Sequence, residues 1–93
     1  MMKHTPGPWY RDGTTVYALN PHNFNRFSAQ IHGAHTPKSE LEAVAQLMQA
    51  APELLEALTE AAEILWGLGQ IGSSPTALEK SAEFKSLIAK ATA

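Results

Sequence analysis

The chain has 93 residues and a mass of 10.1 kDa, with seven Lys or Arg against nine Asp or Glu and no cysteine. A chain of this length leaves no room for a separate cofactor domain. The missing cysteines exclude disulfides, thiolate zinc sites, iron–sulfur clusters and a cysteine nucleophile, and the formal charge of −2 disfavours nucleic acid or anionic lipid as a partner.

Composition divides the chain into two parts of opposite charge. Residues 1–38 have four Lys or Arg against one Asp, a net charge of +3, and residues 39–93 have three Lys against eight Glu, a net charge of −5. Such a difference is typical of a strand-rich half followed by a helix-rich half. We therefore expect a single domain, residues 1–93, with a strand-rich half at 1–36 and a helical half at 37–93.

The first half predicts an antiparallel sheet between residues 8 and 32. Asp12-Gly13 separates two short runs rich in aromatic and β-branched residues, and glycine readily adopts the positive φ that a tight hairpin turn requires. Residues 20–23 (Asn-Pro-His-Asn) supply a second turn, and apolar and polar residues then alternate from 27 to 32. We expect three short strands, whose apolar face needs a helix to cover it.

The second half predicts helices over residues 37–50, 52–66 and 75–91, so the expected fold class is α+β. The first helix can begin with Thr36 as N-cap or with a capping box at Ser39. Because Pro52 has no amide hydrogen, the chain either kinks there or, as we favour, stops and restarts with Pro52 in the first turn of the next helix. Three glycines between residues 67 and 72 favour a flexible connection to the last helix.

The second helix carries two stripes. Leu54, Leu58, Ala61 and Leu65 recur at helical spacing, and glutamates 53, 56, 60 and 63 form an acidic stripe that faces either solvent or a basic surface. Leucine-rich helices and a thin sheet have little to bury against within 93 residues, which predicts a homo-oligomer.

Residues that could carry chemistry do not form a catalytic or metal-binding pattern. His32 and His35 are three apart with no third ligand at a fixed spacing, so we expect no metal and no cofactor. The sequence has no Gly-x-Ser-x-Gly elbow and no phosphate-binding glycine motif, and its glutamates lie on helix surfaces. We expect a protein that is not an enzyme.

A segment rich in aromatic and cationic residues predicts a ligand-binding site. Aromatic rings can stack on a planar group while arginine and histidine hold a phosphate or carboxylate. The predicted ligand-binding residues are Trp9, Tyr10, Arg11, Tyr17, Asn25, Arg26 and His32. Packing against the sheet is the alternative role of Trp9 and Phe27, and pairing with the acidic helix is the alternative role of an arginine.

Three stretches resemble a family of small phage and prophage proteins. Residues 4–9 (His-Thr-Pro-Gly-Pro-Trp) resemble its opening, residues 50–58 its central Ala-Ala-Pro-Glu-Leu-Leu-Glu-Ala-Leu helix, and residues 88–92 its tail. The family's helix before the proline often reads Asn-Ala-Arg, whereas this chain has Val44-Ala45-Gln46, so no role of that Asn or Arg carries over. The resemblance implies a phage accessory protein made in the cytoplasm of a bacterial host cell.

Small accessory phage proteins act mostly by binding, and two mechanisms fit the residues. In the first, the oligomer sequesters a small anionic, nucleotide-type ligand of host defence signalling, which would make it an anti-defence protein. The alternative is a protein–protein adaptor or inhibitor that docks a host or phage protein through its helices or its sheet edge. We expect neither a membrane nor a nucleic acid as partner.

Overall fold

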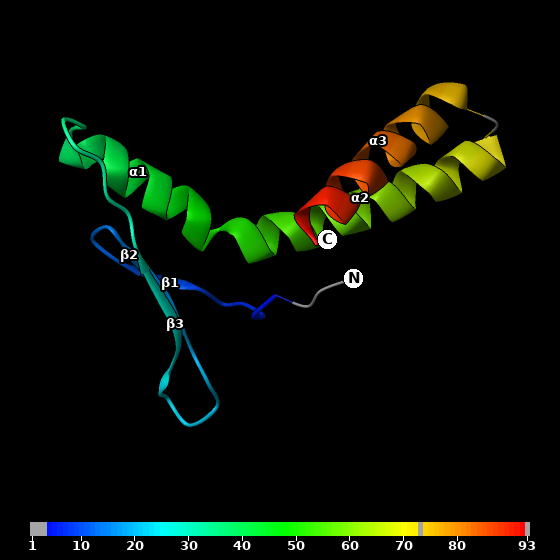
Figure 1. Ribbon diagram of the computed structural model, residues 1–93. Coiled ribbons are helices and arrows are strands. Elements are labelled where there is room, and N and C mark those ends of the chain that lie inside the picture. The colour runs from blue at the N-terminus through cyan, green and yellow to red at the C-terminus, as the bar shows by residue number, and fades with distance from the viewer. Residues whose placement is uncertain (1–3, 73, 93) are drawn as a thin grey trace. The chain divides into compact units, whose positions relative to one another are not determined.

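The computed structural model describes residues 4–72 and 74–92, and it has an α+β fold (Figure 1). Its elements in chain order are β1 (Tyr10–Asp12), β2 (Thr15–Leu19), β3 (Asn25–Gln30), α1 (Lys38–Gln49), α2 (Ala51–Gly72) and α3 (Pro75–Ala91). They confirm the predicted antiparallel sheet followed by helices. The chain forms two compact units, a sheet unit of Thr5–Glu53 and a hairpin unit that begins at Leu54.

The sheet is built by the two predicted turns. Its strands lie in the order β1-β2-β3, with each neighbouring pair antiparallel. Gly13 has a φ of 61° in the first turn. In the second turn the side-chain oxygen of Asn20 accepts hydrogen bonds from the amides of His22 at 2.9 Å and Phe24 at 3.1 Å, which replaces the strand pairing that the turn interrupts.

Helix α1 lies against β1 and β2 and covers one face of the sheet (Figure 1). Val16 and Ala18 on β2 and Ala45 on α1 are buried, and they form the core of the sheet unit. Neither predicted N-cap is used: the helix begins after Pro37 without a side-chain cap, and the Thr36 hydroxyl donates to the carbonyl of Ala34 instead.

The break at Pro52 confirms the stop-and-restart prediction. Ala50 ends α1 with φ −82° and ψ −4°, and its amide bonds the carbonyl of Gln46. Helix α2 begins at Ala51, so Pro52 lies in its first turn, where the missing N–H leaves no helical hydrogen bond unmade.

The prediction that the second helix ends near residue 66 is wrong. Helix α2 continues through Gly67 and Gly69 to Gly72. Gly69 is buried, and a Cβ built on it would lie 2.6 Å from Cδ2 of Leu78, so the glycine lets α3 approach closely. This packing offsets a glycine helix-propensity cost of about 1 kcal/mol per residue.

Helices α2 and α3 form an antiparallel hairpin (Figure 1). The Ser74 side chain caps α3 by accepting a hydrogen bond from the amide of Ala77, and Pro75 occupies the first helical position. The helix spans Pro75–Ala91, which confirms the predicted helix over 75–91. Within the described residues, no helix is both long enough and apolar enough to cross a membrane.

Candidate binding surface

The register of the strands assigns each predicted site residue to one face of the sheet. Side chains of directly paired residues lie on the same face, and side chains alternate along each strand. Arg11, Val16 and Ala29 form one row across the three strands, and Tyr10, Tyr17 and Ser28 form the adjacent row. Because Val16 is buried under α1, the first row belongs to the covered face and the second to the open face.

Trp9 lies on the covered side of the sheet. Its ring meets the ring of Phe27 edge to face, with centroids 5.1 Å apart and an interplanar angle of 78°. Its indole N–H donates to the carbonyl of Thr5 at 3.0 Å. Both rings are half-buried, and this geometry agrees with the packing role considered for them.

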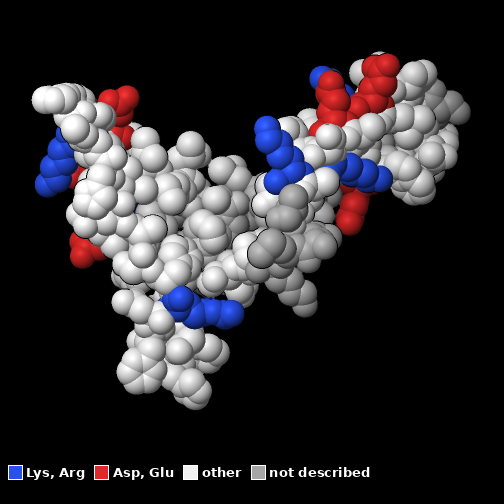
Figure 2. Space-filling view, in the orientation of Figure 1, with Lys and Arg blue, Asp and Glu red and all other residues white. Residues whose placement is uncertain are grey.

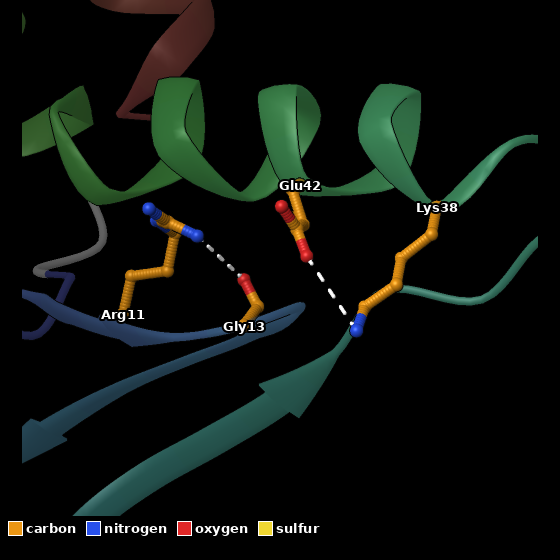
Figure 3. Close-up of polar contacts among 4 residues, drawn as sticks. All are labelled: Arg11, Gly13, Lys38 and Glu42. Atoms are coloured by element: carbon orange, nitrogen blue, oxygen red, sulfur yellow. Dashed lines mark hydrogen bonds and ion pairs between the residues drawn. The ribbon is translucent and has the colours of Figure 1, made fainter.

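Arg11 links the first hairpin to α1. Its Nε donates to Oε1 of Gln46 at 2.8 Å, and its Nη1 donates to the carbonyl of Gly13 at 2.9 Å. Figure 3 shows the guanidinium between β1 and α1, near a 3.8 Å ion pair between Lys38 and Glu42 on the helix. Two of its five N–H groups are therefore committed to holding the sheet unit together.

The open face carries a stacked pair of tyrosines. The rings of Tyr10 and Tyr17 are 5.6 Å apart at an interplanar angle of 30°, and Tyr10 is 40% exposed. The register places four polar residues and one leucine on the same face, namely Asp12, Thr15, Ser28, Gln30 and Leu19. We call this surface, with its two tyrosines, the tyrosine face.

The three remaining predicted residues lie at the start of β3 or after its end. Asn25 pairs with Leu19, which places it at the end of the tyrosine face. Arg26 falls at the register shift opposite Ala18 and Leu19, and His32 follows the end of β3; all three predicted residues are exposed. The structure thus brings Tyr10, Tyr17 and Asn25 to one face and puts Trp9 and Arg11 on the other.

Several members of the tyrosine face were missed by sequence reasoning. Thr15, Ser28 and Gln30 are small or neutral polar residues, which carry no chemical signal of their own. Thr15 can be found from the alternation of side chains, because it is two residues from Tyr17 once Asp12-Gly13 fixes the hairpin turn. Ser28 and Gln30 can be found only from the pairing of β3 with β2.

The structure offers no metal centre in the part of the chain that it describes. There, no three or more His, Cys, Asp or Glu side chains gather closely enough to hold a metal ion. His35, the partner considered for His32, stands in a turn with a φ of 63°.

The comparisons with known proteins point to a phage family. Residues 1–93 match the model of the family described as Salmonella phage P22 protein Y8K6. No match is found among the curated proteins or the solved structures. The match covers the whole chain and confirms the expectation of a small phage protein family: the chain belongs to the family of Salmonella phage P22 protein Y8K6.

Proposed function

We propose that the protein is a non-enzymatic phage accessory protein that acts as an adaptor or inhibitor, and that the tyrosine face is where it docks a host or phage protein. The observation that carries this proposal is the stacked, partly exposed pair of Tyr10 and Tyr17. Tyrosine is enriched in protein interfaces and at their energetic centres, because it combines a large rigid apolar ring with a polar tip.

The surroundings of the two rings fit a protein partner. Polar side chains flank them, neutral except for Asp12, and a polar rim is typical of a transient interface. β3 is also an edge strand of the described sheet, so a partner strand can pair beside the same face.

The position of Arg11 argues against a small anion as the first choice. A nucleotide held between stacked rings and a cation needs both on one side of the sheet. Arg11 lies on the covered face and already bonds Gln46 and Gly13, whereas the charged residue on the tyrosine face is Asp12. Because the guanidinium of Arg11 and the two rings lie on opposite faces, we favour the adaptor function over nucleotide sequestration.

Site-specific photocrosslinking in phage-infected cells tests the proposal. A benzophenone amino acid replaces Tyr10 in one variant and Phe24, which is 70% exposed in the second turn, in the matched control. We expect one protein to be captured at position 10 and not at position 24. The purified partner should then bind Y17A at least tenfold more weakly than it binds F24A. Equal capture at both positions, or equal affinity of the two variants, would contradict the proposal.

A second candidate function is the binding of a small anionic, nucleotide-type ligand of host defence signalling. The observation that favours it is Arg26, an exposed guanidinium with no hydrogen-bond or ion-pair partner among the described residues, next to Asn25 at the end of the tyrosine face. Calorimetric titration with cyclic and linear nucleotides should give heats that R26Q abolishes. Flat heats with the unmodified protein would remove this candidate.

A further inference from the structure

The hairpin unit carries a second, apolar surface that does not involve the sheet. Six residues of α2 recur at alternating spacings of three and four, and they are Leu54, Ala57, Ala61, Ile64, Leu68 and Ile71. The four large ones are among the exposed apolar residues of the chain, at 54% for Leu54, 62% for Ile64, 58% for Leu68 and 89% for Ile71. We call this row the α2 seam.

The α2 seam is separate from the row that packs against α3. That inner row includes Leu58, Ala62, Leu65 and Gly69, which are buried or half-buried. At 100° per residue, the two rows lie roughly 100° apart around the helix. One side of α2 is thus used inside the hairpin, and a second apolar side of the helix is not covered by the described residues of the hairpin unit.

Helix α3 extends the same surface. Leu87 is 54% exposed and lies about 120° around α3 from the buried Ser81. The antiparallel course of the helices puts Leu87 on the side of the α2 seam, and it puts Trp66 and Lys85 on the opposite side. The Lys85 ammonium 5.5 Å from the centre of the Trp66 ring agrees with that placement.

We infer that the hairpin unit is a self-association module in which the α2 seam and Leu87 of one copy pack against a second copy of this chain. Apolar residues at alternating spacings of three and four occupy the a and d positions of a heptad repeat. Helices with this pattern pack side by side along their length. Two hairpins joined in this way form a four-helix bundle.

The charges favour one arrangement of the two copies. Residues 54–72 of α2 contain three glutamates and no cation, whereas α3 has three lysines against two glutamates. Packing α2 on the partner's α3 brings together helices of net charge −3 and +1, while packing α2 on its own copy brings two acidic helices together. In the first arrangement each helix also has antiparallel neighbours.

The surface is large enough for such a contact. From Leu54 to Ile71 the seam is about 26 Å long, and two helices side by side are about 20 Å wide. This gives on the order of 500 Å² per copy and 1,000 Å² in total, the lower bound for a specific interface. In Figure 2 the end of the hairpin where the two helices meet shows no charged side chains on the face in view, which agrees with the charge-free sequence from Ile64 to Leu78.

Sedimentation equilibrium of the full chain between 10 and 500 µM tests the inference, because these concentrations lie roughly 10-fold to 500-fold above a micromolar Kd. We expect twice the 10.1 kDa chain mass for the unmodified protein and for Q70E, which adds a charge on the polar side of α2. I64E and L68E, whose side chains are exposed and whose helical circular dichroism should be unchanged, should raise the dissociation constant at least 100-fold. A monomer throughout the range, or an oligomer that both seam variants leave intact, would overturn the inference.

Disulfide trapping tests the arrangement, because the chain has no cysteine of its own. With A61C and L87C purified separately and mixed, we expect a crosslink between the two variants. Crosslinking of A61C to itself, with none to L87C, would show that α2 packs on the partner's α2 and would overturn the arrangement.

Discussion

Ser81 of α3 donates a 2.8 Å hydrogen bond to the carbonyl of Ala62 of α2, and both residues are 1% exposed. The hydroxyl therefore lies in the buried contact between the two helices of the hairpin. A side chain of this size allows close packing, and its polar atom has a partner there.

Replacing Ser81 with alanine removes the bond but keeps the space. The carbonyl of Ala62 lies within α2 and retains its helical partner, so S81A should lower the free energy of unfolding by only about 1 kcal/mol. S81V adds volume at the contact, so its free energy of unfolding should be about 1 to 3 kcal/mol lower than that of S81A. Urea denaturation followed by circular dichroism measures both. Equal stability of the two variants would show that the helices are not closely packed at Ser81.

Gly67 and Gly69 form a matched pair for testing the helical continuation of α2. A Cβ on Gly67 meets nothing within 4 Å, so G67A should raise the free energy of unfolding by about 1 kcal/mol through helix propensity. A Cβ on Gly69 meets Leu78 at 2.6 Å, so G69A should be less stable than G67A by about 1 to 3 kcal/mol. If these residues formed a flexible loop instead, the two variants would have the same stability.

The bond between Arg11 and Gln46 predicts an energetic coupling between β1 and α1. R11A and Q46A should each lower the free energy of unfolding of the sheet unit. The loss in the double variant should be smaller than the sum of the two single losses by about 0.5 to 1.5 kcal/mol. R11K keeps the charge but cannot reproduce the two directed bonds, so it should resemble R11A. Strict additivity of R11A and Q46A would mean that the contact does not form in solution.

Val16 tests where the core of the sheet unit lies. It is 0% exposed beneath α1, so V16A should lower the free energy of unfolding by about 1 to 3 kcal/mol through lost burial and the cavity left behind. Val44 on α1 is 42% exposed, and V44A should cost less than half as much. Thermal unfolding of the two variants side by side provides the comparison, and a larger loss for V44A would place the core elsewhere.

The local signals in the sequence predict the elements well because each depends on near neighbours. Asp12-Gly13 and Asn20 determine their turns through φ preference and side-chain bonding, and Pro52 determines a helix start through its missing amide hydrogen. The end of α2 depends on Leu78, nine residues beyond Gly69, and glycine composition alone carries no information about that contact.

The candidate site was predictable only in part, for a similar reason. Trp9, Tyr10 and Arg11 are consecutive, so composition groups them, but alternate side chains of a strand point to opposite faces. Which face is covered depends on where α1 packs. The exposed α2 seam has the same residue types as the inner row of α2, and only the position of α3 distinguishes the two.

Hydroxyl-radical footprinting of the two tyrosines tests the central claim, because Tyr10 and Tyr17 are the only tyrosines in the chain. Their oxidation rates are compared between the isolated protein and the protein in phage-infected cells, with Phe24 as the internal reference. Binding through the tyrosine face predicts that the oxidation of both tyrosines slows at least roughly fivefold in the cells while that of Phe24 does not, because a bound partner shields the two rings from water. Unchanged oxidation of both tyrosines in infected cells would contradict it.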